Sequence, residues 1–228
     1  MTRASLMSLT AELVAKVQRF EPDDGPRPEI PQLDDVDFNQ YTDELLTTLG
    51  SRPLRVFAYG SLIWKPEFEA IGQYRATLNG WHRSFCLNIE RWRGTRAFPG
   101  LMMALDQGGF CEGVIYELPP QGKHAQVRKL LEREMDNKPP TNLPMIVSAE
   151  ISGQMVEAIA FTANPIGPDY AGVVSLQEVA QVLARAAGHW GSCAEYLFKT
   201  VSNLEQLGIR DQDLWQLQHM VAEEIKAL

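Results

Sequence analysis

The order of the predicted elements is the feature that most constrains the fold. From Leu54 onward, short apolar and β-branched segments, each ended by Gly, Pro or Asp, precede most of the segments with helical spacing. A doubly wound sheet requires strands and helices to alternate along the chain. This sequence lacks that alternation, so it predicts an α+β or mixed domain rather than regular βαβ winding.

The predicted strands begin with a compact apolar run over residues 54–62, which reaches a glycine turn at Gly60. Because the run lies between turn residues, it is typical of a buried strand. Further β-leaning segments cover residues 75–89, 100–109 and 110–119. Two more, residues 145–151 and 155–163, are joined by Ser-Gly-Gln, which predicts a pair of neighbouring strands.

Helical periodicity appears at both ends and in the middle of the chain. It predicts helices over residues 4–20, 39–50, 123–135, 175–188, 192–207 and 211–228. Ser5, Ser175 and Asp211 are candidate N-caps, and Gly188 is a candidate C-terminal stop. Residues 21–35 are rich in Pro and Asp and indicate a linker or an arm lying over the body.

The first fifty residues are too short and too polar to hold a core of their own. We therefore expect residues 1–50 to form a helical and Pro-rich N-terminal extension, and residues 51–228 to form the main domain.

Charge and composition limit the partners. The chain carries 21 Lys and Arg against 29 Asp and Glu, a net charge of −8, which disfavours binding to nucleic acid or to an anionic membrane. No apolar run has membrane-spanning length, and Glu12 and Lys16 interrupt any signal-peptide pattern. Three widely spaced cysteines without a C-x-x-C pair favour a reducing compartment. We expect a cytoplasmic protein that acts on a small molecule.

Motif searches exclude several kinds of chemistry. The sequence has no phosphate-binding loop, dinucleotide fingerprint, zinc-protease helix or nucleophile elbow, and its four histidines show no metal-ligand spacing. Cys86 and Cys111 lie in predicted strands and are interpreted as buried small hydrophobes. We therefore expect neither a cofactor nor a metal, which leaves acid–base chemistry as the main enzymatic option.

The first candidate site is Tyr59-Gly60-Ser61-Leu62, at the end of the first predicted strand. Glycine lets the backbone bend, with a positive φ available to it, and the amides of Ser61 and Leu62 could then point into one concavity. Such amides bind a carboxylate or an oxyanion. An ordinary tight turn explains the same residues.

The second candidate is Glu134. It shares one helical stripe with Val127, Leu130 and Leu131, whereas Glu132 does not. An inward-facing carboxylate would have a raised pKa and could exchange protons near neutral pH. A carboxylate at the end of a helix could equally point to solvent, and the sequence leaves both orientations open.

Two further stretches have more than one interpretation. Residues 80–100 carry Arg83, Arg91, Arg93 and Arg96 against Glu90, with aromatic residues between them. They could stack on single-stranded nucleic acid, clamp an acidic substrate or form a solvated hairpin end. Residues 188–200 place two glycines before a helix, which fits either an anion site or a plain turn between helices.

Six stretches in order resemble the ChaC-like family of γ-glutamylcyclotransferases. They are VFAYGSLIWKPEF, RG-x-x-x-x-PG from Arg93 to Gly100, GVIYELP, the Arg133-Glu134 pair, PDYAG (168–172) and G-x-x-G-x-x-x-EYLF (188–198). The resemblance runs from about Leu54 to near the C-terminus. It implies a small mixed β-barrel with flanking helices, and cleavage of glutathione into 5-oxoproline and cysteinylglycine without a cofactor.

The resemblance also implies roles for individual residues. Glu134 aligns with the catalytic glutamate, and residues 51–228 would be the catalytic domain. The γ-glutamyl group would be held by Tyr59, Gly60, Ser61 and Leu62, with Tyr170 and Tyr196 lining the pocket. Where many relatives carry a Gly-Gly-Tyr stretch after the glutamate, this chain has MDNKPP. The substrate would be glutathione or another γ-glutamyl compound, and the alternative is a non-catalytic module that binds or senses such compounds.

Overall fold

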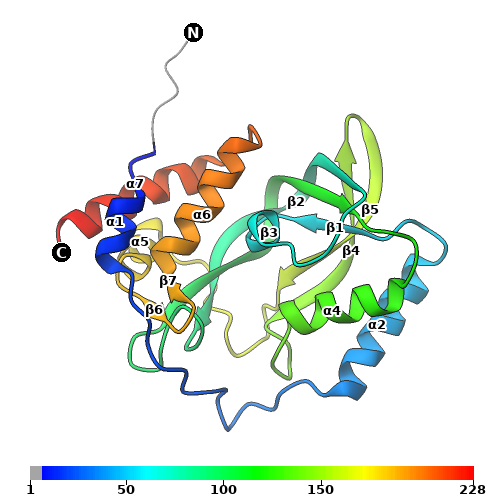
Figure 1. Cartoon of the computed structure of the whole chain (residues 1–228), viewed down its shortest axis with the longest axis horizontal. Helices are drawn as coiled ribbons and strands as arrows, with labels where there is room; N and C mark the ends of the chain where they lie inside the picture. Colours follow the sequence, from blue (N-terminus) through cyan, green and yellow to red (C-terminus); the bar gives the residue numbers. More distant parts are fainter. Residues whose placement is uncertain (1–6) are drawn as a thin grey trace. The chain divides into compact units, whose positions relative to one another are not determined.

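The structure is a computed structural model that describes residues 7–228. Its described residues form two compact units, which are treated separately below (Figure 1). The barrel unit comprises residues 26–87 and 103–172. The helical unit comprises residues 7–25, 88–102 and 173–228. The division at residue 50 that composition suggested stays a prediction.

The five long strands of the described chain form a closed barrel. Its strands are β1 (Arg55–Ala58), β2 (Gly72–Ile89), β3 (Gly100–Glu117), β4 (Asn142–Ile151) and β5 (Gln154–Ala163), in the order β1-β3-β2-β4-β5. β4 and β5 form an antiparallel hairpin, whereas β5 pairs in parallel with both β1 and β3. The barrel is therefore mixed, and the predicted α+β class with a small mixed barrel is confirmed.

Two helices of the barrel unit pack against each other, α2 (Asp35–Leu49) and α4 (Lys123–Glu134). Asp34 begins α2 in a capping box with Asp37. On α4, the Arg128 guanidinium binds Asp35 at 2.6 Å and lies 5.0 Å from the centre of the Phe38 ring. A single helical turn, α3 (Ser61–Trp64), follows β1.

The helical unit contains α1 (Ala11–Val17), α5 (Leu176–Leu183), α6 (Cys193–Gln206) and α7 (Gln212–Lys226). A small two-stranded sheet, β6 (Ala187–Gly188) with β7 (Gly191–Ser192), lies between α5 and α6 in the sequence. Ser175, Ser192 and Asp211 cap α5, α6 and α7. No helix of residues 7–228 is both long and apolar enough to cross a membrane.

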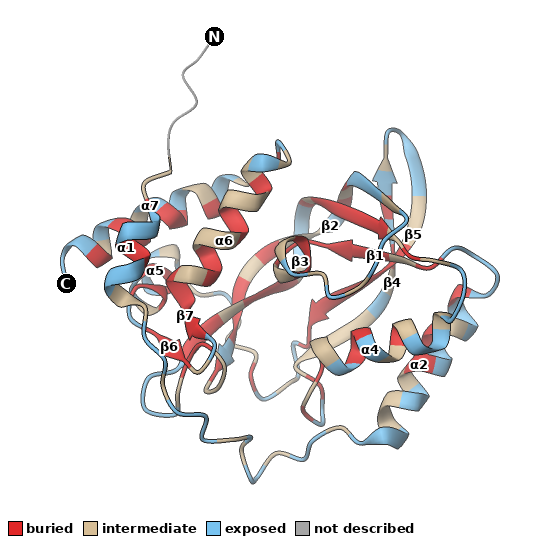
Figure 2. Cartoon of the chain, in the orientation of Figure 1, coloured by how far each residue is buried: buried red, intermediate tan, exposed pale blue. Residues whose placement is uncertain are grey.

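The barrel strands supply much of the apolar core. The fully buried side chains of the strands include Phe57, Ile115, Ile159 and Phe161. Helix α4 contributes Leu131, which is also fully buried. Figure 2 shows β1 and β3 as largely buried, whereas the turn between β4 and β5 is exposed. Burying large apolar side chains supplies the main drive for closing the barrel.

Several predicted boundaries were wrong. The first helix begins at Ala11 under a Thr10 cap, and the candidate cap Ser5 lies outside the described residues. The helix predicted over residues 39–50 begins earlier, at Asp35. The helix predicted to end at Gly188 ends at Leu183, since Gly188 belongs to β6.

The two strands predicted over residues 100–109 and 110–119 are one continuous strand, β3. Gly108 and Gly109 adopt positive φ values of 109° and 61° inside it. Glycine reaches these angles at little cost, so the strand continues through the pair.

Candidate active site

Glu134 is the last residue of α4. Val127, Leu130 and Leu131, on the same stripe of the helix, are all buried. The Glu134 side chain is only 15% exposed, whereas the Glu132 side chain is 48% exposed and pairs with Arg128 at 2.8 Å. Of the two orientations that the sequence left open, the structure shows the inward one.

Burial controls the electrostatics of Glu134. It raises the pKa of the Glu134 carboxyl above its ordinary value, and the nearby Glu67 carboxylate adds to this effect. The Arg133 guanidinium opposes it, because its Nε lies 2.9 Å from Oε1 of Glu134. The main-chain carbonyl of Glu134 accepts a hydrogen bond of 3.1 Å from Asn142 Nδ2, which ties the helix end to β4. The result is a fixed carboxyl group suited to proton exchange nearer neutral pH than an exposed glutamate.

The Tyr59–Leu62 segment turns from β1 into α3. Tyr59 is buried, and its carbonyl accepts a hydrogen bond of 2.8 Å from the buried Arg83 Nε. Gly60 has φ −137° and ψ −125°, so the bend does not use the positive φ that the sequence made available. Among the described residues, the amides of Ser61 and Leu62 donate to no backbone acceptor. Amides in the first turn of a helix commonly lack an acceptor within the helix, and such amides can bind an anionic group.

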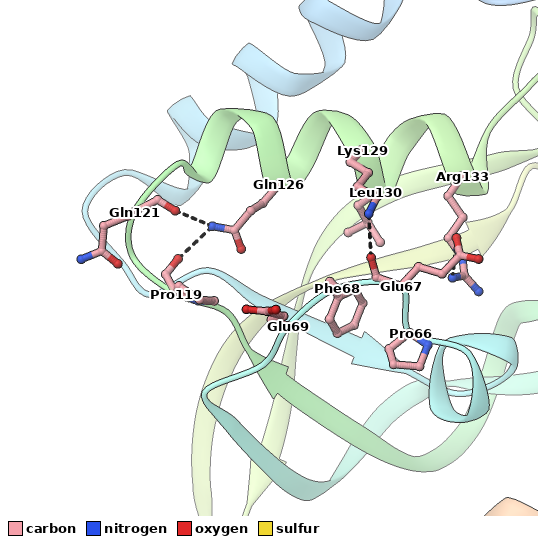
Figure 3. A pocket seen from close by; sticks show the side chains of 10 residues that line it. All are labelled: Pro66, Glu67, Phe68, Glu69, Pro119, Gln121, Gln126, Lys129, Leu130 and Arg133. Atoms are coloured by element: carbon pink, nitrogen blue, oxygen red, sulfur yellow. Dashed lines mark hydrogen bonds and ion pairs between the residues drawn. The ribbon is translucent and has the colours of Figure 1, made fainter.

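A pocket of about 350 Å³ opens between α4 and the segment that follows α3. Figure 3 shows its lining side chains, which are Pro66, Glu67, Phe68, Glu69, Pro119, Gln121, Gln126, Lys129, Leu130 and Arg133. Glu67 forms one side, where its carboxylate lies 3.2 Å from Arg133 Nη1 and its carbonyl accepts a hydrogen bond from Lys129 Nζ. Glu134 is not part of this lining.

Sequence reasoning missed the Glu67–Arg133 pair, although Arg133 stands directly before the predicted glutamate. Glu67 lies 66 positions before Arg133 in the chain, and only tertiary packing brings the two together. The one sequence feature that pointed to Arg133 was its place in the Arg133-Glu134 pair of the family resemblance.

The two tyrosines assigned to the pocket lie in different units. Tyr170, in the barrel unit, donates a hydrogen bond of 2.8 Å to Asp106 Oδ2, which raises the pKa of Tyr170 to about 12. Tyr196, in α6 of the helical unit, is buried with the Arg93 guanidinium 5.8 Å from its ring centre. Each has a defined environment, and their shared role in a pocket stays a prediction.

Three arginines of residues 80–100 bind carbonyl or carboxylate groups of the protein itself. Arg83 donates to main-chain carbonyls of Tyr59 and Glu112, and Arg91 forms two contacts of 2.7 Å with Asp23. Arg93 is buried and contacts Glu195 at 2.8 Å. The interpretation of residues 80–100 as a solvated hairpin end is therefore wrong for Arg83, Arg91 and Arg93, because these three side chains bind acceptors of the protein.

The start of α6 fits the plainer interpretation of residues 188–200. The Ser192 hydroxyl accepts a hydrogen bond from the Glu195 amide, and the Glu195 carboxylate fills the first turn beside Arg93. A carboxylate of the protein itself thus occupies the positive end of this helix.

The cysteines behave as predicted for small buried side chains. Cys86, Cys111 and Cys193 are buried and form no disulfide, and burial raises the pKa of Cys86 and of Cys193 to about 11. Thiols of this kind are poor nucleophiles at neutral pH. Within residues 7–228, His, Cys, Asp and Glu side chains form no group of three or more that could hold a metal ion.

Comparison with protein families identifies the chain. The family model described as ChaC-like protein matches residues 54–224, three quarters of the sequence. The chain belongs to the ChaC-like family. Glu134 and the Tyr59–Leu62 segment both lie inside the matched region of this ChaC-like protein.

Individual relatives agree with the assignment. The ChaC-like chain is 38% identical over 175 residues to the glutathione-specific gamma-glutamylcyclotransferase of Escherichia coli, covering 75% of each chain. It is 28% identical over 167 residues to the human glutathione-specific gamma-glutamylcyclotransferase 1, covering 70% of this chain and 73% of the relative. The crystal structure of a yeast glutathione-specific cyclotransferase superposes with a TM-score of 0.68 at 23% identity, covering 75% of this chain and 96% of that one. The structural likeness confirms the fold.

Proposed function

We propose that this ChaC-like protein is a glutathione-specific γ-glutamylcyclotransferase that converts glutathione into 5-oxoproline and cysteinylglycine. The observation that carries the proposal is the buried carboxyl group of Glu134, at the end of α4 and inside the family match. The names of the Escherichia coli and human relatives support the choice of glutathione.

The proposed reaction is an intramolecular acyl transfer. The α-amine of the glutamyl residue attacks the γ-carbonyl carbon, and a C–N bond closes a five-membered lactam. The amide bond to cysteine then breaks. The α-amine is mostly an ammonium at neutral pH, so a base must first remove a proton from it. Glu134 as carboxylate accepts that proton and later delivers one to the departing cysteine nitrogen.

The enzyme's main contribution in this scheme is alignment. Nucleophile and electrophile belong to one molecule, and well-aligned intramolecular attack can lower a barrier by about 7–11 kcal/mol. We assign the amides of Ser61 and Leu62 to an anionic group of the substrate, either the glutamyl α-carboxylate or the developing oxyanion. Tyr59, Gly60, Tyr170 and Tyr196 complete the proposed substrate-binding set.

The proposal makes no use of a thiol, a metal or a nucleic acid. The raised thiol pKa values of Cys86 and Cys193 argue against a covalent acyl-cysteine. Cysteines that form no disulfide also fit the reducing cytoplasm in which we place the protein.

The test is to incubate the purified protein with glutathione in the presence of a chelator and to measure 5-oxoproline and cysteinylglycine. Equal amounts of the two products support the proposal. If neither product forms while calorimetry detects glutathione binding, the protein is instead a binding or sensing module.

A substrate panel then tests specificity. Glutathione, a γ-glutamyl dipeptide and a γ-glutamylamine share the reacting group and differ only on the leaving side. We expect the highest kcat/KM for glutathione. Equal kcat/KM values across the panel would support a γ-glutamylcyclotransferase activity and contradict its specificity for glutathione.

A further inference from the structure

The segment of residues 26–33, here called the arm segment, pairs with the turn of residues 135–141 that directly follows Glu134. The Leu33 amide donates to the Asp136 carbonyl and the Lys138 amide donates to the Pro31 carbonyl, each at 2.8 Å. Gln32 and Asn137 face each other in an antiparallel bridge. The family match begins only at residue 54, so the arm segment lies outside it.

Side chains reinforce this backbone pairing. Gln32 Nε2 donates to Asn137 Oδ1 at 2.8 Å. Lys138 Nζ lies 2.5 Å from Asp37, the residue that completes the capping box of α2. The turn is therefore held from two sides by residues that precede the family match.

A buried polar network extends the link to the PDYAG stretch. The Arg27 guanidinium contacts the Asp169 carboxylate, which is itself buried. The other carboxylate oxygen of Asp169 accepts hydrogen bonds from Asn137 Nδ2 at 3.2 Å and Thr141 Oγ1 at 3.1 Å. One carboxylate thus joins the arm segment, the turn after Glu134 and the stretch that carries Tyr170.

We propose that the arm segment is a positioning element of the active site, acting on Glu134 through the 135–141 turn and on Tyr170 through Asp169. Arg27 and Gln32 are its positioning residues. Gln32 binds Asn137 directly, and Arg27 is linked to Asn137 through Asp169. Asn137 belongs to MDNKPP, the stretch that replaces the Gly-Gly-Tyr found in many relatives, so the arm segment gives the end of α4 a support of its own.

The physical reason is the sensitivity of proton transfer to placement. A displacement of about 1 Å in a group that must meet the substrate can cost about a hundredfold in rate. Glu134 ends its helix, and the last helical hydrogen bond of α4 runs from the Met135 amide to the Leu131 carbonyl at 2.9 Å. External pairing is then what holds the chain direction beyond Met135.

The inference rests on the proposed function, and its test uses Arg27→Met, Arg27→Lys and Arg55→Met in the full chain. Arg55 is a matched control because it also forms an ion pair, with Glu117 at 2.8 Å, and its side chain is as exposed as that of Arg27. The exposed fractions are 22% for Arg55 and 21% for Arg27. Arg55 is not part of the arm segment, the turn or the proposed site.

We expect Arg27→Met to lower kcat for glutathione about tenfold or more, with a smaller change in KM. Arg27→Lys keeps a cation opposite Asp169 and should restore most of that loss. Arg55→Met should keep kcat within about twofold of the unmodified protein at a similar loss of thermal stability. Unchanged kcat in Arg27→Met, or an equal loss of kcat in Arg55→Met, would overturn the proposal.

Two further measurements keep the test decisive. If Arg27→Met fails to fold, Gln32→Ala serves as the second variant. It removes the hydrogen bonds that the exposed Gln32 side chain donates to Asn137 at 2.8 Å and to the Ile30 carbonyl at 3.5 Å, and it should also lower kcat. If the unmodified protein turns over no γ-glutamyl compound, the proposed function has failed. Hydrogen exchange of the Leu33 and Lys138 amides then tests the arm by itself. Faster exchange in Arg27→Met than in Arg55→Met supports the link, and equal exchange overturns it.

Discussion

Nε of Arg133 lies 2.9 Å from Oε1 of Glu134, so that two consecutive residues at the end of α4 form an ion pair with each other. The same guanidinium also reaches Glu67, at 3.2 Å. Arg133 therefore stands between two carboxylates, one on the wall of the pocket and one in the proposed catalytic position. This arrangement sets the charge balance of the site and leads to the first two predictions.

Glu134→Gln should lower kcat by about a hundredfold or more, because removing a general acid–base typically costs about 10²–10⁴. Glu132→Gln is the matched control, since its side chain is exposed and pairs only with Arg128 among the contacts of the described residues. Both variants are compared by 5-oxoproline formation at saturating glutathione. A fully active Glu134→Gln with an inactive Glu132→Gln would show that the catalytic carboxylate has been assigned wrongly.

The pH dependence of kcat should reveal the raised pKa of Glu134. The base works as a carboxylate, so the rate falls as pH drops through that pKa, which burial places above the ordinary 4.5. Arg133→Met removes a cation that lowers the pKa, so the acid limb should move to higher pH. Glu67→Gln removes a carboxylate that raises it, so the limb should move to lower pH. Shifts of the same sign in both variants would contradict this electrostatic account.

Gly113→Ala should destabilise the barrel by about 1–3 kcal/mol, the usual cost of overpacking. A Cβ at Gly113 would stand 2.5 Å from the Ala58 carbonyl oxygen and 2.8 Å from the Phe57 ring. Denaturant unfolding measures the loss, with Ser148→Ala on the exposed face of β4 as the control. Equal stability of the two variants would mean that β1 and β3 can separate locally without cost.

The cysteines should resist alkylation in the folded protein. All three are buried, and the pKa values of Cys86 and Cys193 are raised to about 11, so almost no thiolate is present at neutral pH. Mass spectrometry after iodoacetamide treatment should find unmodified, active protein, while the denatured chain reacts at all three positions. Rapid loss of activity on treatment of the native protein would reopen a role for a thiol.

Local patterns in the sequence were sufficient for much of the fold. Apolar spacing predicted α4, α6 and α7 to within a few residues, because a helix that buries one face must repeat its apolar residues every three to four positions. The β4–β5 hairpin was visible for a similar reason, since its strands flank a turn signal. The stripe of Val127, Leu130 and Leu131 also distinguished Glu134 from Glu132.

Those local patterns did not predict which residues far apart in the sequence contact each other. Nothing in the letters joins Arg27 to Asp169, Glu67 to Arg133 or Arg83 to the Tyr59 carbonyl, because each pair is brought together only when the barrel closes and the segments around it pack. Local sequence thus placed Glu134, and not Glu132, on the apolar stripe of α4, and it left open whether the carboxyl group faces the body or the solvent. Tertiary structure alone decided what surrounds it, because burial and the placement of distant charges are properties of the packed chain.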